Sequence, residues 1–106
     1  MALYGIYGRH EIATCPINNL ENAKDVIKLV NTDLSQMLPK YKINKIIGMY
    51  HSGLEHTSIW IVDAEDAHLV DEFLLDLGAT KLSEFRIVPL KTIEGVAERA
   101  KKVHGL

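Results

Sequence analysis

Cysteine is almost absent from this chain, which has only Cys15 among its 106 residues. No disulfide can therefore form within the chain. No apolar run approaches the roughly 20 residues needed to span a bilayer, so we expect no membrane segment. The first residues read as a strand and lack the basic segment and apolar run of a secretory signal. We therefore expect a cytoplasmic protein.

An excess of one charge is also lacking. The net charge is −2 and the Lys and Arg residues are scattered, so no basic stripe predicts nucleic-acid binding. The few aromatic residues do not alternate with basic ones, as a base-stacking surface would require. The sequence has no glycine-rich phosphate loop and no CxxC, HExxH or GxSxG motif. Nucleotide-binding, zinc-protease and hydrolase interpretations therefore have no support.

Hydrophobic periodicity predicts a single α+β domain over residues 1–106. Alternating β-branched segments indicate strands, and apolar residues three or four apart indicate helices. The first helix is expected over Leu20–Met37, with Asn18 as its cap and Pro39 ending it, and Asp63 is expected to cap the second helix. The predicted strands are Ala2–Tyr7, Ile43–Tyr50, Thr57–Val62 and Glu84–Leu90, and the other predicted helices are Ala64–Leu77 and Thr92–His104. This βαββαβ order with an extra C-terminal helix is the ferredoxin-like arrangement, with an antiparallel four-stranded sheet.

Both faces of the predicted sheet are apolar. Counting alternate residues places Ile47 and Met49 on one face with His51, and Ile46 and Tyr50 on the other. The first two helices can cover only one of these faces, so the second face is expected to pack on another subunit. We therefore predict a homodimer or a higher even oligomer.

The segment His51-Ser52-Gly53-Leu54-Glu55-His56 joins two predicted strands. If these strands pair as a hairpin, the two imidazoles face each other with Cβ atoms roughly 4.5–5.5 Å apart. Imidazole is the commonest metal ligand and the side chain best suited to proton transfer near neutral pH. The pattern predicts a site at this end of the hairpin without specifying a reaction.

His10 and Cys15 extend the predicted site. In the ferredoxin-like topology the ends of the first two strands share a sheet edge with the start of the third, so His10, His51 and His56 are expected to converge. Imidazoles combined with a thiolate suit zinc, copper or iron better than calcium or magnesium. We predict a site for a transition metal or a small anion. The alternatives are histidines that only bond backbone or solvent, and a Cys15 buried as a small apolar residue.

Three further side chains are candidates for ligand contact. Trp60 and Met49 could line a pocket, although large apolar groups in central strands are more often part of a core. Arg86 could pair with a carboxylate, and a solvated surface arginine is the alternative. His68 and His104 are expected at the surface, His104 at a helix end where the dipole favours it.

A resemblance adds to these predictions. The strand order, Met49-Tyr50-His51 before a short turn, and Ile59–Asp66 entering the second helix resemble the dimeric α/β-barrel superfamily, especially a branch of small proteins without a known activity in which a histidine ends the second strand. The resemblance covers roughly residues 2–90 and leaves Thr92–Leu106 as an added helix. It implies two ferredoxin-like sheets packed face to face as a homodimer, with a pocket in each half. Only His51 is carried over from it.

Three functions are open on these grounds. The first is a binding protein whose histidine-lined site holds a transition metal or a small molecule. The second is a small cytoplasmic enzyme of isomerase, lyase or monooxygenase type, because the superfamily that the chain resembles includes such enzymes. His51 or His56 would then act as general base, or a metal would activate water. The third is a structural or interaction dimer without a ligand.

Overall fold

The computed structural model describes residues 2–81 and 83–106, which form a four-stranded antiparallel sheet in the order β2-β3-β1-β4 and three α-helices. The predicted α+β class and antiparallel sheet are confirmed, and the order is compatible with a ferredoxin-like fold. The elements are β1 (Ala2–Arg9), α1 (Leu20–Val30), β2 (Ile43–Ser52), β3 (Thr57–Ala64), α2 (Ala67–Leu77), β4 (Glu84–Leu90) and α3 (Ile93–His104).

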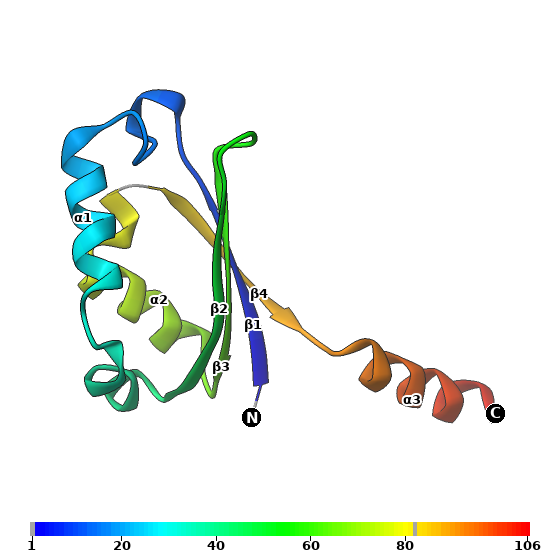
Figure 1. Ribbon diagram of the computed structural model, residues 1–106. Helices are drawn as coiled ribbons and strands as arrows, with labels where there is room; N and C mark the ends of the chain where they lie inside the picture. Colours follow the sequence, from blue (N-terminus) through cyan, green and yellow to red (C-terminus); the bar gives the residue numbers. More distant parts are fainter. Residues whose placement is uncertain (1, 82) are drawn as a thin grey trace.

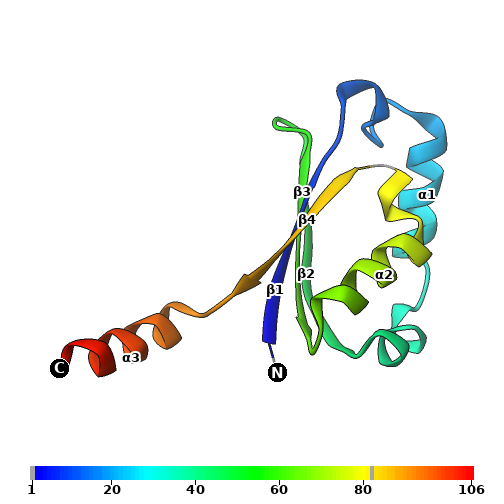
Figure 2. The ribbon, with the colours of Figure 1, turned by 180° about the vertical axis from the view of Figure 1, so that it is seen from behind.

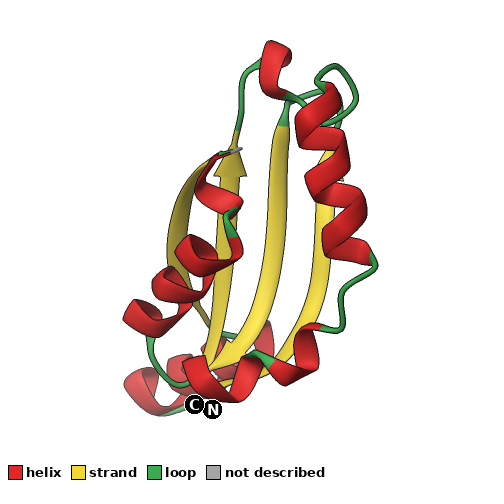
Figure 3. Cartoon of the chain, turned by 90° about the vertical axis from the view of Figure 1, so that its left-hand side faces the viewer, coloured by secondary structure: helices red, strands yellow, loops and turns green. Residues whose placement is uncertain are grey.

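Helices α1 and α2 lie across one face of the sheet (Figures 1 and 3). The core is between the sheet and α2, whose Val70, Phe73 and Leu74 are fully buried against Ile6 and Val62. Among the described residues, no helix covers the opposite face of the sheet (Figure 2). We call this second surface the open face.

Two irregularities in β2 change which residues face the core. The register with β3 shifts between Ile43 and Lys45 and again between Ile46 and Gly48. Each bulge moves the alternation of side chains by one residue. Ile46 is therefore opposite the buried Val62, and Ile47 is 48% exposed. The prediction from strict alternation, which put Ile47 and not Ile46 on the face of Met49 and His51, is wrong.

Helix α1 is shorter than predicted, because it ends at Val30 and not near Met37. The hydroxyl of Thr32 donates to the Lys28 carbonyl at 2.6 Å, and the Asp33 carboxylate accepts from the Ser35 amide at 3.0 Å. Such side chains compete with the helical backbone for hydrogen bonds and start a new turn. The apolar periodicity continues through this region in two short 3₁₀ helices, Leu34–Gln36 and Leu38–Tyr41.

The caps of the first two helices also differ from prediction. The side chain of Asn19, and not Asn18, accepts from the Asn22 amide at 3.0 Å. Asp66, and not Asp63, accepts from the His68 amide at 2.9 Å. Asp63 remains in β3, paired with Leu3, because this strand continues to Ala64. The paired strand therefore continues beyond Val62, where the hydrophobic alternation predicts its end.

Helix α3 begins where predicted, with Thr92 accepting from the Gly95 amide at 3.0 Å. It projects away from the rest of the chain beyond the end of β4, and none of its residues is buried (Figures 1 and 2). The radius of gyration is 16.0 Å, whereas about 13 Å is typical of a compact chain of this length. The projecting helix explains this difference.

Candidate metal centre and adjoining cavity

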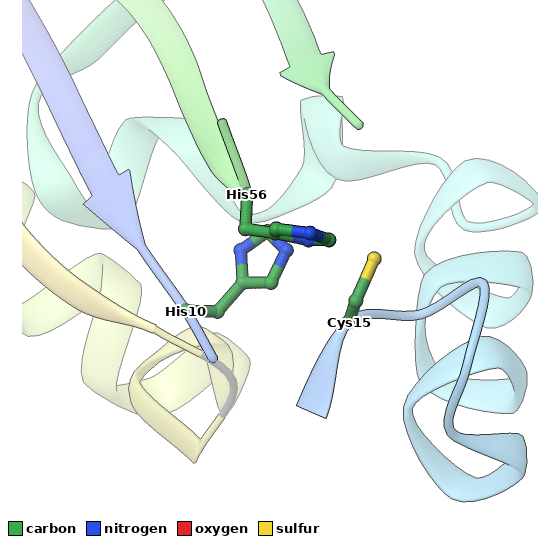
Figure 4. A group of neighbouring side chains, drawn as sticks. All are labelled: His10, Cys15 and His56. Atoms are coloured by element: carbon green, nitrogen blue, oxygen red, sulfur yellow. The ribbon is translucent and has the colours of Figure 1, made fainter. Parts of the chain in front are cut away.

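One end of the sheet gathers side chains from three separate parts of the chain. His10 directly follows β1, Cys15 lies in the loop between β1 and α1, and His56 precedes β3. One ligand atom from each of these residues lies within 4.8 Å of the other two, and Figure 4 shows the three side chains directed toward one another. We call these residues, together with the neighbouring His51, the His/Cys cluster.

The loop that carries Cys15 is held by its own hydrogen bonds. The amides of Asn18 and Asn19 both donate to the Cys15 carbonyl, at 2.8 and 2.9 Å, and the Asn22 side chain donates to the Thr14 carbonyl at 2.7 Å. These bonds fix the loop to the first turn of α1. The Cys15 side chain is 1% exposed as a result, with its sulfur directed into the cluster.

His56 is held by the backbone. Its φ of +56° lies in the left-handed region, which few residues other than glycine and asparagine adopt without cost. Its carbonyl accepts from the His10 amide at 3.0 Å, so the start of β3 is joined to the residue that follows β1. His51 and His56 are not cross-strand partners, as the hairpin argument expected, because His51 pairs with Ser58. The turn and not the ladder places His56 near the cluster.

His51 completes the group from β2. Its Nε2 lies 3.4 Å from Nε2 of His10 and 3.9 Å from Sγ of Cys15. The His10 and His51 rings are stacked with centroids 5.1 Å apart. His51 is exposed, whereas His10 is 9% exposed. The cluster therefore has a buried side and one histidine facing solvent.

The spacing of these atoms is close to that of a tetrahedral site. With zinc bonds of about 2.05 Å to nitrogen and about 2.3 Å to sulfur, a tetrahedron has N–N edges of about 3.4 Å and N–S edges of about 3.6 Å. The measured separations of 3.4 Å and 3.9 Å around His51 Nε2 match these edges to within a few tenths of an ångström. The ligand atoms of His10, Cys15 and His56 lie within 4.8 Å of one another, so they would have to approach by up to about 1.2 Å to reach the same edges.

Two observations describe the electrostatics of the cluster. Burial lowers the pKa of His10 below its ordinary 6.5, and the neighbouring His51 and His56 lower the pKa further by charge repulsion. His10 is therefore held neutral, in the state that can donate a lone pair. Among the described residues, Nδ1 of His56 is buried without a hydrogen-bond partner. Such a group costs roughly 1–3 kcal/mol unless something binds it.

A cavity of about 640 Å³ adjoins the cluster, between the sheet, α1 and the end of α2. His10 and His51 lie at its wall, and both of the predicted pocket residues, Trp60 and Met49, line it. Trp60 is also part of the core, at 7% exposure and with its ring centroid 6.1 Å from that of Phe85. The volume of the cavity is in the range of small-molecule pockets.

Arg86 does not belong to this cavity. It pairs with Tyr7 across the strands, and its guanidinium carbon lies 5.9 Å from the centre of the Tyr7 ring on the open face. Arg86 is exposed, so a solvated surface arginine describes its position better than a ligand contact does. His68 and His104 are exposed, as expected.

Phe85 and Leu29 are cavity residues that the sequence reasoning did not single out. A signal for Phe85 existed, because it pairs with Gly8, where a Cβ would lie only 2.7 Å from the Phe85 ring. A glycine opposite an aromatic residue indicates that the ring lies across the strand. Leu29 had no comparable signal, because its place depends on how α1 crosses the sheet.

No family model matches the chain, and neither a curated protein nor a solved structure matches it. Among the described residues, no helix combines the length and the apolar character needed to cross a membrane.

Proposed function

We propose that this protein binds one transition-metal ion through His10, Cys15 and His56, with His51 as the fourth ligand. The observation that carries the proposal is the convergence of the first three ligand atoms to within 4.8 Å of one another. The orphaned Nδ1 of His56 supports it, because a metal ion is a natural partner for a buried imidazole nitrogen.

The donor set favours zinc among the three candidate metals. Three imidazoles and one thiolate give a closed four-coordinate site of the kind zinc occupies, and the N–N and N–S spacings fit its bond lengths. Two histidines and a cysteine with a weaker fourth ligand are also the donors of copper electron-transfer sites. Iron is less favoured, because no carboxylate belongs to the cluster formed by the described residues.

The test is native mass spectrometry and elemental analysis of protein purified without a histidine tag. We expect one zinc ion per chain. Cys15→Ser and His56→Ala should each weaken zinc binding by a factor of about 100 or more, equivalent to roughly 2.8 kcal/mol. His68→Ala and His104→Ala are matched controls, since both histidines are exposed and distant in sequence from the cluster. Binding that survives the first two variants, or is lost in the controls, contradicts the proposal.

The ligation of the metal by Cys15 is tested separately by cobalt substitution. A thiolate-to-cobalt charge-transfer band with intense visible transitions is expected for a tetrahedral site that includes Cys15. The band should vanish in Cys15→Ser and persist in His68→Ala. Preferential retention of copper over zinc during purification would assign the site to copper instead.

The cavity supports a second function, the binding of a small, mostly apolar molecule beside the metal. Its lining includes Trp60, Met49 and Phe85, and the exposed His51 is the ligand that such a molecule's nitrogen or oxygen donor could replace. With His51 displaced, the ion would keep three protein ligands and one open position, which is the arrangement of catalytic zinc sites and of the enzyme alternative.

Trp60 is the only tryptophan of the chain, so its fluorescence reports occupancy of the cavity directly. Phenylimidazole is a suitable probe, with phenylpyrrole as a probe of the same shape without the donor nitrogen. We expect both probes to change the fluorescence. Phenylimidazole should bind zinc-loaded protein at least about tenfold more tightly than phenylpyrrole does. Equal affinities would remove the metal from the cavity function, and an unchanged Trp60 signal would remove the cavity function itself.

A further inference from the structure

A free hydroxyl lies in the wall of the cavity, beside the cluster. Ser58 of β3 is directly opposite His51 of β2, so the two side chains project from the same face of the sheet, and both line the cavity. The Ser58 hydroxyl forms no hydrogen bond with another described residue. It is therefore available to donate to a molecule that occupies the cavity next to His51.

The position of this hydroxyl depends on Gly8, which is opposite Ser58 on β1. A Cβ at Gly8 would lie only 2.5 Å from the Ser58 hydroxyl oxygen and 2.7 Å from the Phe85 ring, so any larger residue would displace one of them. The missing side chain allows a polar group and an apolar ring to lie together in the cavity wall. Leu29 and Leu77 add to the apolar lining. A molecule that fits this cavity has an apolar body and a polar end directed toward His51 and Ser58.

The charge of that polar end follows from the metal site proposed above, on which this inference rests. The charges of +2 for zinc and −1 for the Cys15 thiolate leave +1 on a site whose other ligands are neutral imidazoles. The cavity wall does not compensate this charge, because its charged residues are two acids and two bases, Asp25, Asp76, Lys28 and Lys81. An uncompensated charge that is removed from water costs several kcal/mol. The site therefore favours an anionic donor over a neutral or a cationic one.

A carboxylate fits both the charge and the hydroxyl. Its single negative charge makes the metal site neutral, whereas a phosphate group with a charge of about −1.5 to −2 would exceed the charge of the site. A phenolate has only one oxygen and would leave the Ser58 hydroxyl without an acceptor. We propose that the cavity binds a carboxylic acid with an apolar body, whose carboxylate replaces His51 on the ion through one oxygen and accepts from the Ser58 hydroxyl through the other.

The test follows Trp60 fluorescence in untagged, zinc-loaded protein with two probes of the same shape. Phenylbutanoate has the carboxylate, and phenylbutanamide has a neutral amide in its place. We expect phenylbutanoate to bind at least about tenfold more tightly than phenylbutanamide does, and the preference to disappear in zinc-free protein. Equal affinities in the zinc-loaded protein would overturn the proposal. A preference that persists without zinc would also overturn it, because it would assign the carboxylate to Lys28 or Lys81.

Elemental analysis of each sample separates this proposal from the proposed metal site. Protein that takes up no zinc overturns both of them. Zinc-loaded protein that binds phenylimidazole but does not prefer phenylbutanoate overturns only the carboxylate.

The role of Ser58 is tested by removing its hydroxyl. Ser58→Ala should weaken phenylbutanoate binding about tenfold and leave the zinc content unchanged, because a hydrogen bond to a charged acceptor is among the stronger ones. Ser35→Ala is the matched control, since the Ser35 hydroxyl donates to Asp33 at 2.6 Å and Ser35 does not line the cavity. It should leave the affinity unchanged. An equal affinity in Ser58→Ala and in the control would overturn the contact with Ser58.

The replacement of His51 gives an effect of the opposite sign. At saturating zinc, His51→Ala should bind phenylbutanoate more tightly than the unaltered protein does, because the fourth position on the ion is already open. Weaker binding in His51→Ala at the same zinc content would show that the carboxylate binds the histidine and not the ion, which overturns the proposed exchange.

Discussion

In most proteins apolar side chains are buried and polar ones are exposed, and the two ends of this molecule depart from that rule in opposite ways. At one end, three imidazoles and a thiol are drawn together, and Cys15 and His10 are nearly inaccessible. At the other end, Ile93 and Val103 face solvent on a well-formed helix. The comparison teaches that buried polar atoms and exposed apolar ones are two forms of the same signal. Each is a surface that a binding partner would satisfy, and the partner proposed for the first end is a metal ion.

The largest effect is expected when a variant in the packed body, formed by the sheet with α1 and α2, is compared with a variant in the arm, formed by α3. Phe73→Ala removes a fully buried ring that packs on Tyr41 with centroids 5.4 Å apart. It should lower the free energy of unfolding by about 3–5 kcal/mol, because it leaves a cavity. Val103→Ala in α3 should change it by no more than about 0.5 kcal/mol when measured in dilute, monomeric protein. Urea denaturation of both variants checks this contrast, and equal losses would show that α3 packs on its own chain.

Metal removal should have the next largest effect and should act only at the cluster end. At a free zinc concentration about 1,000 times the dissociation constant, binding stabilises the folded state by about 4 kcal/mol. Chelation should therefore lower the melting temperature of the unaltered protein by roughly 15–30 °C. The shift should be absent in Cys15→Ser and unchanged in the double variant of α3, Val96→Glu with Val103→Glu. A shift that is lost in the α3 variant would show that metal binding at the cluster depends on α3.

Helix caps provide a matched pair of smaller effects. Asp66→Ala removes the cap of α2, which packs on the core, and should cost about 1 kcal/mol of global stability. Thr92→Ala removes the equivalent cap of α3. In dilute monomeric protein it should leave the urea midpoint unchanged and accelerate hydrogen exchange in α3 alone. A similar change of midpoint in both variants would contradict the separation of the arm from the body.

The smallest effect concerns pH. The folded protein holds the pKa of His10 below 6.5, so the unfolded chain binds more protons as the pH falls through 6.5. This contribution to stability is complete above pH 6.5 and decreases below it, until His10 is protonated in the folded protein as well. Metal-free protein should therefore lose stability from pH 7 to pH 5, and His10→Gln should lose less over the same range. Thermal melts in chelator at each pH compare the two, and parallel curves would assign the slope to other groups.

Much of the fold followed from patterns that are local in the sequence. The ranges of β4 and α3 could be predicted because the β-branched residues of Glu84–Leu90 and the cap residue Thr92 are local signals. The order of strands then placed the ends of β1 and β2 and the start of β3 at one edge. This is why His10, His51 and His56 could be grouped before their side chains were seen.

The remaining features depend on contacts that no local pattern records. The bulges in β2 leave Asn44 and Ile47 without a partner in β3, and neither residue is of a type that indicates a bulge. The left-handed turn at His56 is a conformation that only a few per cent of non-glycine residues adopt, so the sequence does not indicate it. Arg86 could be put on the correct face only once its pairing with Tyr7 was known. The outward course of α3 is not encoded in the helix itself.

The burial of Cys15 also has a practical consequence for studying the protein. As the sole thiol of the chain and at 1% exposure, it should react slowly with maleimides and other thiol-selective reagents. The natural sequence is therefore close to a thiol-free background. A cysteine introduced on the polar side of α3 can carry a spin label or dye without any change to the native residue. The movement of α3 can then be followed while the proposed ion site stays intact.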